Sequence, residues 1–295
     1  MTFWRAQVYF WRAKNSALIM ITVFQLSQRV EDQVQKSTDC NLSLPAQLEN
    51  IFTGLWLKTG QKMQTNVTGL KGNNVEFKVG NGVGRGYLSV PKTSRGGVVV
   101  LHAWWGLNDF FKSLCDRLAA EGYSAFAPDL REGKVARTVD EAKEMMKKEN
   151  QELAEKTVLG GHEYLHAHPS IKGHKIGVVG FSMGAAWALW LSTKKPDVAA
   201  VTAFYGTYDL DFSASEASYL GHFAPNDEWE PEDSIRGLEE KIRQSSRPVT
   251  FHTYPGTKHW FFENDRPEYA PLAAGLAWTR TLEFIHSNLG RSSST

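Results

Sequence analysis

Short apolar runs alternate with longer amphipathic segments along the chain from about residue 70 onward. Runs such as 97–103 are apolar almost throughout, which is typical of strands that are buried on both faces of a parallel sheet. The first two runs are joined through Gly80-Asn81-Gly82, a sequence that favours a tight turn between antiparallel strands. The pattern predicts strands over 75–79, 86–90, 97–103, 124–128, 175–179, 199–205, 219–224 and 248–254.

The segments between these runs have the apolar spacing of helices that pack on a sheet. In 108–121, the large apolar residues fall on one helical face. Thr138, followed three residues later by Glu141, predicts a capping box at the start of one long helix over 139–166. Helices are expected over 108–121, 139–166, 185–190, 231–245 and 267–289. This alternation predicts an α/β fold with a mostly parallel sheet, covered by helices on both faces, in one domain over 66–290.

Residues 1–65 differ from the rest of the chain. The first 26 residues contain no acidic side chain, and their apolar run over 17–24 is too short to span a bilayer as a helix. A basic flank beside a short apolar run is typical of a targeting segment; the alternatives are an interfacial helix or a non-native extension with no folded function. We interpret 1–65 as an N-terminal extension and 291–295 as a disordered tail. A cytoplasmic protein is expected, or an organellar or secreted one if the extension is a targeting signal.

Charge and cysteine content exclude several kinds of partner. The 295 residues include 33 basic and 32 acidic side chains, a balance that argues against recognition of nucleic acid or anionic membranes by bulk charge. Cys40 and Cys115 provide no disulfide framework, and we expect Cys115 to be buried. His162, His166 and His168 have no acidic partner in a metal-binding pattern, so a surface cluster is expected. We predict no metal, no cofactor, no stable membrane span, and a monomer or small homo-oligomer that acts on a small molecule.

The most specific chemical motif is Gly180-Phe181-Ser182-Met183-Gly184, which lies between a predicted strand and a predicted helix. G-x-S-x-G in this context is typical of a nucleophile elbow, a tight turn that raises the serine hydroxyl above the sheet edge. Bulky side chains two residues before or after the serine would clash in such a turn, and glycine avoids both clashes. Ser182 is therefore the predicted nucleophile.

A serine hydroxyl needs an adjacent base, and the base needs a group that orients it. His259 follows the last predicted strand on a turn that contains proline and glycine, and it is the predicted general base. Three carboxylates could orient it. Asp227 follows the strand before the histidine strand, which is the usual place for the acid in an α/β-hydrolase, and it is preferred. Asp209 and Asp211, which follow the preceding strand, are the alternatives.

The other parts of an acyl-transfer site are expected beside the same strand ends. The N–H groups of Met183 and Trp104 are the predicted oxyanion donors, because Met183 follows the nucleophile and Trp104 follows the strand over 97–103. Aromatic side chains next to these loops are expected to form an apolar substrate pocket. The predicted pocket residues are Trp105, Phe181, Trp229 and Trp260.

Taken together, these motifs resemble those of the dienelactone hydrolase family, a branch of the α/β-hydrolases. The resemblance covers about residues 70–290 and rests on VVVLHAWWGLN over 98–108, LAAEGY over 118–123, APDL over 127–130, GFSMG over 180–184, GHFAPND over 221–227, YPG over 254–256 and HWF over 259–261. It implies an α/β-hydrolase fold and hydrolysis of lactones or carboxylic esters without a metal or organic cofactor. It also implies a Ser-His-Asp triad of Ser182, His259 and Asp227 that acts through an acyl-enzyme.

Three positions depart from the best-known members of that family. Ser182 stands where those proteins have cysteine, and Ala103 stands where they have a glutamate that holds the resting thiol. Glu263 replaces an arginine that binds the carboxylate of the dienelactone, and it would repel an anionic substrate. We therefore expect a neutral, apolar or aromatic ester or lactone. The alternatives are a thioesterase or peptidase that uses the same residues, or a catalytically silent binding module, which only the changes at Ala103 and Glu263 would favour.

Overall fold

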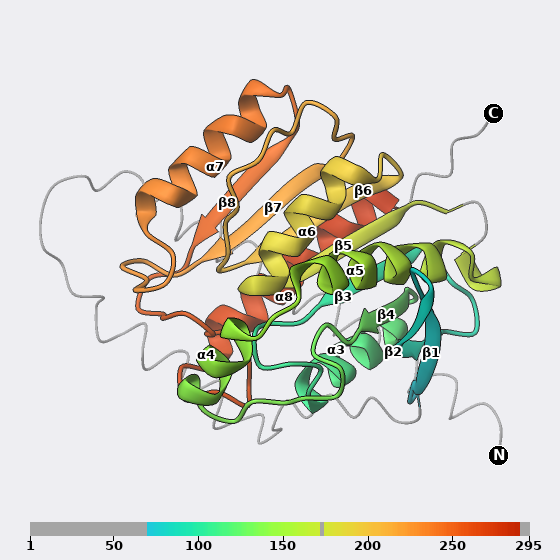
Figure 1. The fold of residues 1–295 in the computed structure, drawn as a ribbon. Coiled ribbons are helices and arrows are strands. Elements are labelled where there is room, and N and C mark those ends of the chain that lie inside the picture. The colour runs from blue at the N-terminus through green and yellow to red at the C-terminus, as the bar shows by residue number, and fades with distance from the viewer. Residues whose placement is uncertain (1–69, 172–173, 290–295) are drawn as a thin grey trace, which may run out of the picture. The chain divides into compact units, whose positions relative to one another are not determined.

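An eight-stranded sheet runs through the part of the chain that the computed structural model describes, residues 70–171 and 174–289. Its strands are β1 (Asn73–Val79), β2 (Gly82–Ser89), β3 (Gly97–Leu101), β4 (Ser124–Pro128), β5 (Ile176–Phe181), β6 (Val198–Phe204), β7 (Ser218–Phe223) and β8 (Val249–Thr253). They lie in the order β1-β2-β4-β3-β5-β6-β7-β8 (Figure 1). The β1–β2 and β2–β4 pairs are antiparallel and all other neighbours are parallel, so the predicted mostly parallel sheet is confirmed.

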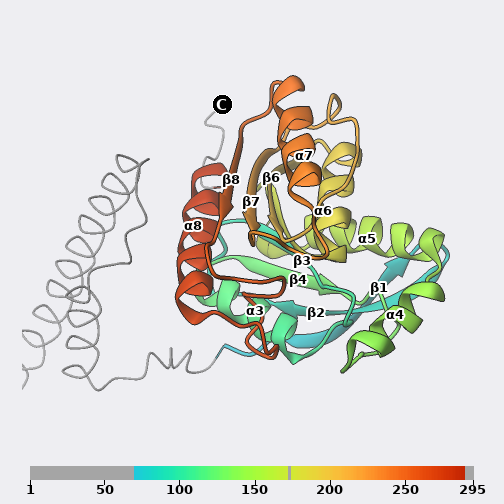
Figure 2. The same ribbon diagram turned by 90° about the vertical axis from the view of Figure 1, so that its left-hand side faces the viewer.

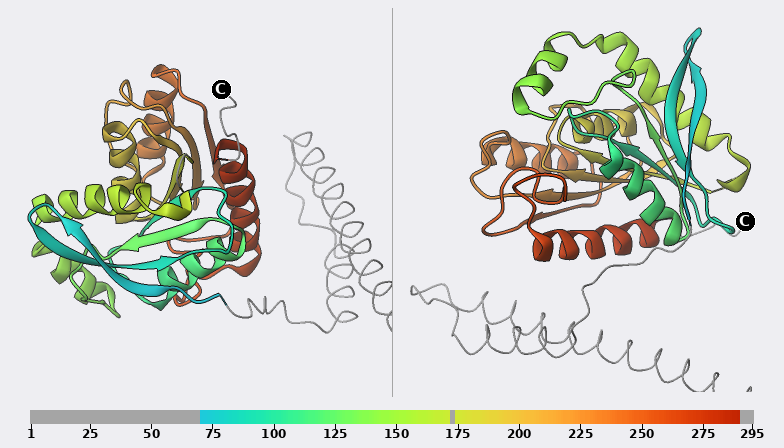
Figure 3. Two further views of the ribbon diagram at one scale, coloured as in Figure 1. Left: turned by 90° about the vertical axis from the view of Figure 1, so that its right-hand side faces the viewer. Right: turned by 90° about the horizontal axis from the view of Figure 1, so that it is seen from below.

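Helices cover both faces of this sheet, as predicted. The helices of the described ranges are α3 (Asp109–Ala120), α4 (Val139–Lys147), α5 (Gln151–His166), α6 (Met183–Lys194), α7 (Glu232–Gln244) and α8 (Pro271–Leu289), with a 3-10 turn at Pro169–Ile171. α3 and α8 lie on one face, and α5, α6 and α7 lie on the other (Figure 2; Figure 3 gives two further views). Both faces of the central strands β3, β4, β5 and β6 are therefore shielded from water, which explains their continuous apolar runs.

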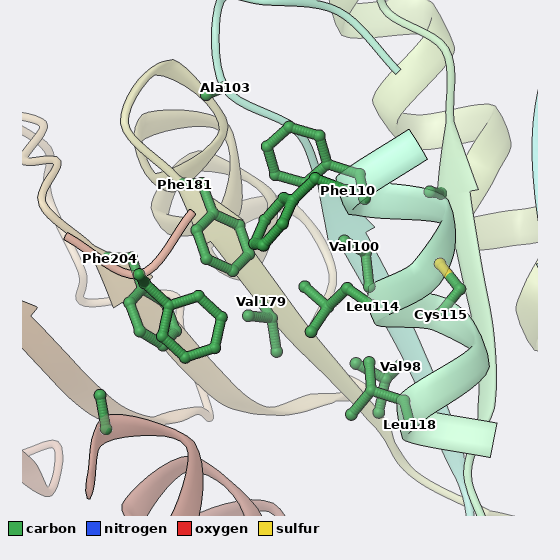
Figure 4. Packing of buried hydrophobic residues seen from close by; sticks show 14 of the residues in the cluster. Val98, Val100, Ala103, Phe110, Leu114, Cys115, Leu118, Val179, Phe181 and Phe204 are labelled. Atoms are coloured by element: carbon green, nitrogen blue, oxygen red, sulfur yellow. The ribbon is translucent and has the colours of Figure 1, made fainter. Parts of the chain in front are cut away.

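Alternate residues of each central strand supply two separate cores. Val98 and Val100 of β3 point toward α3, where they pack near Leu114 and Leu118 (Figure 4). Val99 of the same strand belongs to the core on the opposite face. This follows from the two-residue period of a strand. Cys115 of α3 is fully buried in the first core, as the sequence predicted.

The helix predicted over 139–166 is wrong in one respect, because the structure divides it into α4 and α5. The capping box of Thr138 and Glu141 is present at the start of α4. After α4, the Asn150 side chain accepts a hydrogen bond from the N–H of Leu153 at 3.1 Å and caps a new helix. Glu149, in the break, pairs with the buried guanidinium of Arg131 at 3.4 Å. A side-chain cap and a tertiary ion pair thus interrupt a segment whose spacing alone favours one helix.

The predicted surface cluster of histidines is also partly wrong. The side chain of His162 is only 4% exposed, and its Nε2 lies 2.9 Å from Oδ2 of Asp197. His166 Nδ1 lies 2.9 Å from the same oxygen. His168 lies apart from them and contacts Ser170. The acidic partner that the local sequence lacks is supplied by the segment before β6, which folding brings next to α5.

Two sets of predictions concern the ends of the chain and the membrane. The extension over 1–65 and the tail over 291–295 lie outside the described residues. Among the helices that are described, none has both the length and the hydropathy that a bilayer-spanning helix requires.

Candidate active site

Three loops that follow parallel strands carry the predicted catalytic side chains. Ser182 directly follows β5, Asp227 lies in the loop after β7, and His259 lies in the loop after β8. The carboxyl ends of parallel strands lie at the same edge of a sheet, which is where sites form in open α/β folds. Residues 77 positions apart in sequence, Ser182 and His259, therefore meet at this edge.

The turn at Ser182 has the geometry that the glycine motif predicts. Ser182 has φ 51° and ψ −116°, a strained conformation for a residue with a side chain. A Cβ atom on Gly180 would lie 2.2 Å from the carbonyl oxygen of Gly184, and a Cβ atom on Gly184 would lie 2.1 Å from that of Leu101. Both distances are far below contact, so glycine is required at both positions. The Ser182 hydroxyl makes no capping bond to α6 and is free for another partner.

Ser182, His259 and Asp227 form a continuous hydrogen-bonded row. His259 Nε2 lies 2.9 Å from the Ser182 hydroxyl, and His259 Nδ1 lies 2.7 Å from Oδ2 of Asp227. The other carboxylate oxygen of Asp227 accepts a hydrogen bond from the backbone N–H of Trp229 at 2.9 Å, which holds the carboxylate in place. The imidazole and the carboxylate are 4% and 1% exposed. With Nδ1–H donated to the carboxylate, Nε2 is left to accept the serine proton.

The two alternative acids do not contact His259. The carboxylate of Asp209 is exposed and forms an ion pair with Lys241. Asp211 accepts a hydrogen bond from the N–H of Ser213 at 2.9 Å, within its own loop. Of the three carboxylates that the sequence left open, the structure brings only Asp227 to the imidazole.

The predicted oxyanion donors belong to the start of α6 and to the turn after β3. Met183 is the first residue of α6, where a backbone N–H has no acceptor within the helix. Trp104 lies in the turn after β3, and the buried side chain of His102 fixes that turn. His102 Nδ1 lies 2.7 Å from the carbonyl oxygen of Ala103, and its Nε2 accepts from the N–H of Leu130 at 3.0 Å. Burial lowers the pKa of His102 to about 4, so the neutral ring that this bonding pattern requires is the stable form.

A cluster of four indoles borders the row. The ring centroids of Trp104 and Trp229 are 5.1 Å apart, and that of Trp260 lies 6.0 Å from Trp104 and 4.9 Å from the His259 ring. Trp104 and Trp229 are half-buried and keep accessible ring surface, whereas Trp260 is only 5% exposed. The indole N–H groups of all four, Trp105 included, are buried and have no hydrogen-bond partner among the described residues.

Two of the predicted pocket residues are buried in the core and leave almost no surface for a substrate. Phe181 is fully buried, because alternation along β5 points it toward α3, where it packs near Phe110 and stacks on Phe204 with 4.6 Å between ring centroids (Figure 4). Trp105 is 1% exposed and is covered by the guanidinium of Arg266, 4.0 Å from the ring centroid. These two predictions are wrong.

Glu263 does not face the site as an anion, contrary to the sequence-based expectation. Its side chain is fully buried, and Oε1 accepts a hydrogen bond from the hydroxyl of Tyr205 at 2.7 Å. Burial raises the pKa of Glu263 to about 8, so the carboxyl group is mainly neutral near pH 7. The ring of Tyr205 in turn lies 4.8 Å from that of His259. Tyr205 therefore packs against the imidazole, a contact that its place at the end of an apolar run did not reveal.

Arg131 is a second side chain near the site that the sequence analysis missed. Its side chain is 4% exposed and pairs with Glu149. One guanidinium nitrogen lies 3.0 Å from the sulfur of Met183, whose backbone N–H is a predicted oxyanion donor. The only sequence signal was its position three residues after β4, at the same sheet edge.

Comparison with known proteins identifies relatives for this chain. The model of the dienelactone hydrolase family matches residues 85–289. A protein of Aquifex pyrophilus named usf is 31% identical over 229 residues, which cover 74% of this chain and 99% of that protein. A protein of Aquifex aeolicus with the provisional name carboxymethylenebutenolidase is 30% identical, with the same coverage. The fold is shared with the dienelactone hydrolase of Anabaena variabilis, with a TM-score of 0.59 at 20% identity over 75% of this chain and 99% of that one.

Proposed function

Because the chain belongs to the dienelactone hydrolase family, we propose that it is a hydrolase that cleaves a small carboxylic ester or lactone with Ser182 as its nucleophile. The observation that carries this proposal is the row of Ser182, His259 and Asp227, with 2.9 Å and 2.7 Å between the bonded atoms. These distances are within the reach that nucleophile activation by a general base requires.

In the first half of the proposed reaction, the Ser182 oxygen attacks the carbonyl carbon of the substrate while its proton moves to Nε2 of His259. Asp227 stabilises the imidazolium that forms, since its carboxylate accepts the Nδ1 proton in a hydrogen bond. The N–H groups of Met183 and Trp104 donate to the oxygen that becomes negative in the tetrahedral intermediate. Donors that are fixed in place by α6 and by the turn at His102 need no reorganisation as this charge develops.

In the second half, the intermediate collapses and the bond between carbonyl carbon and leaving oxygen breaks. Nε2 of His259 returns its proton to that oxygen, which leaves as an alcohol or, from a lactone, stays attached to the acyl chain as a free hydroxyl. Water then attacks the acyl-enzyme with the same imidazole as base, and Ser182 is released with a carboxylic acid as the product.

The surroundings of the row support a neutral substrate with a flat or apolar acyl group. Trp104 and Trp229 are half-buried, and the ring centroid of Trp229 lies 6.3 Å from that of the His259 imidazole. Partly accessible indole rings favour planar apolar groups. The carboxyl group of Glu263 is buried away from this surface, so the preference rests on the aromatic faces and not on repulsion by that side chain.

The decisive experiment compares Ser182→Ala with the unchanged full chain on p-nitrophenyl esters and on an aromatic lactone. We expect kcat to fall at least about a thousandfold, because the nucleophile is lost while binding remains. A fluorophosphonate probe should label the unchanged protein once and should leave Ser182→Ala unlabelled. Ser213→Ala, at an exposed serine, is the matched control and should retain both properties. Labelling of Ser182→Ala to the same extent as the unchanged protein would overturn the assignment.

A further inference from the structure

A second group of chemically active side chains lies at the opposite edge of the sheet from Ser182. His162 and His166 lie on α5, four residues apart and on one face, and Asp197 directly precedes β6. The carbonyl oxygen of Asp197 accepts a hydrogen bond from the N–H of Ile176 at the start of β5, whereas Ser182 follows the end of the same strand. At about 3.3 Å per residue, a strand of six residues separates the two sites by roughly 17–20 Å.

The three side chains converge on one point. His162 Nε2 and His166 Nδ1 each lie 2.9 Å from Oδ2 of Asp197. The two rings are nearly parallel, with an interplanar angle of 22° and 5.8 Å between centroids. The three ligand atoms all lie within 4.8 Å of one another. Two imidazole nitrogens and one carboxylate oxygen thus share a space small enough for a single ion.

This set of atoms matches the donor preferences of zinc and related ions. Imidazole nitrogens and carboxylate oxygens bind Zn²⁺ at about 2.0–2.2 Å, which places two ligands of a tetrahedral ion about 3.4 Å apart. An ion at the centre would therefore displace the protons now shared with Asp197 and move its oxygen outward by a few tenths of an ångström. Asp197 can make this movement because its side chain is 35% exposed.

The surroundings leave one side of the group open. His162 is buried and holds the inner position, whereas the side chain of His166 is 55% exposed and faces water. The nearby Lys195 ammonium is paired with Glu163 at 2.9 Å, so its charge is compensated. The three ligands together carry one negative charge when both imidazoles are neutral, which favours a cation.

We propose that His162, His166 and Asp197 bind a divalent transition-metal ion of the zinc class, with water in the remaining coordination positions. The ion would join the C-terminal half of α5 to the segment that leads into β6, two parts of the chain that are 31 residues apart between His166 and Asp197. The site is structural in this proposal, and it stands whether or not Ser182 is a nucleophile.

The test is calorimetric titration of Zn²⁺ into the full chain without any affinity tag. The unchanged protein should bind one ion. His166→Ala removes the exposed ligand and Asp197→Asn removes the shared charge; each should weaken binding at least tenfold. His168→Ala is the matched control, because it removes a neighbouring imidazole that lies outside the group, and it should bind like the unchanged protein. Neither test variant alters the buried His162, so both are expected to fold.

Two further readouts separate this site from the candidate active site. Zn²⁺ at a hundredfold excess over its dissociation constant should raise the melting temperature by roughly 5–10 °C in the unchanged protein and in Ser182→Ala, and much less in His166→Ala. Ester hydrolysis should be the same in His166→Ala as in the unchanged protein. Absence of stoichiometric binding, or binding by His166→Ala and Asp197→Asn as tight as that of His168→Ala, would overturn the proposal.

Discussion

Ser182 has a backbone conformation that few residues other than glycine adopt, with φ 51° and ψ −116°. Strain of this kind persists only where the surrounding structure holds it, and here β5 and α6 do so on either side. In this conformation the hydroxyl makes no capping hydrogen bond to α6 and lies 2.9 Å from Nε2 of His259. The hydroxyl of the candidate nucleophile is therefore placed by the backbone.

Replacement of Asp227 tests the hydrogen-bonded row that it forms with His259 and Ser182. Asparagine in its place can donate to Nδ1 and would favour the tautomer with its proton on Nε2, which cannot accept the proton of Ser182. We expect Asp227→Asn to lower kcat for p-nitrophenyl acetate about 10⁴-fold near neutral pH. Asp209→Asn, at an exposed carboxylate, should leave kcat unchanged. A decrease of less than tenfold in Asp227→Asn would contradict the proposed role.

The contacts of single residues could be predicted only where the signal is local. Ser182 lies within a five-residue motif, and His259 and Asp227 follow strands that could be recognised. Glu263 could not be assigned in this way, because its environment depends on Tyr205, which is 58 residues distant in sequence. Its burial reverses the expected role of the side chain, from a charge that repels substrate to a neutral group that accepts a hydrogen bond from Tyr205.

The start of α6 approaches the end of β3 closely at the candidate site. A Cβ atom on Gly184 would lie 2.1 Å from the carbonyl oxygen of Leu101 and 2.6 Å from that of His102. The helix that begins at Met183 can therefore reach the end of β3 only if residue 184 is glycine. Because α6 and the end of β3 lie this close, the N–H of Met183 and the turn that carries Trp104 are brought near each other.

Replacement of Gly184 by alanine should push α6 away from β3. We expect a loss of about 1–3 kcal/mol in the free energy of unfolding, measured in urea, together with reduced ester hydrolysis. Gly237→Ala provides the opposite control, because Gly237 lies inside α7 and has no atom within 4 Å of an added Cβ. That substitution should stabilise the protein by about 0.5–1 kcal/mol and leave hydrolysis unchanged. Equal effects of both substitutions would contradict the role of the close approach.

The local sequence pattern predicts the bounds of some helices and strands more accurately than those of others. The strands and α3, α7 and α8 were predicted within a few residues, because each has a complete apolar face or run. The break between α4 and α5 was not predicted. Its causes are the cap formed by Asn150 and the ion pair of Glu149 with Arg131. The ion pair depends on how the loop after β4, which carries Arg131, packs against this segment. The spacing of apolar residues within a helix does not indicate such a contact.

For the whole molecule, burial of carboxyl groups makes stability depend on pH. Burial raises the pKa of Glu263 to about 8 and is the main cause that raises the pKa of Glu230 to about 7. Between about pH 4.5 and 8, the folded protein keeps the proton on Glu263, whereas the unfolded chain releases it. The folded state therefore loses stability as pH rises through this window, by up to about 1.4 kcal/mol per pH unit for one such group.

Glu263→Gln should remove this contribution, because the amide is neutral at every pH and its oxygen can still accept from Tyr205. Relative to the unchanged protein, the variant should gain stability steadily from pH 5 to pH 8, as measured by urea unfolding at several pH values. For Glu228→Gln, at an exposed position, the free energy of unfolding should change with pH in the same way as that of the unchanged protein. A constant difference between Glu263→Gln and the unchanged protein across this range would refute the proposed protonation of Glu263.

The sequence by itself determined the α/β class, the family resemblance and the positions of the candidate nucleophile and base. The spacing of apolar residues and the residue types that form tight turns are local properties, so a short stretch of sequence is enough to recognise them. The compartment and the role of residues 1–65 stay predictions. The sequence preferred Asp227 to Asp209 and Asp211, and the tertiary structure brings Asp227 alone of these three to His259. Only the tertiary structure placed Phe181 and Trp105 in the core, neutralised Glu263 and joined Asp197 to His162 and His166. Each of these depends on groups far apart in the chain, whose distances and burial exist only once the sheet has formed.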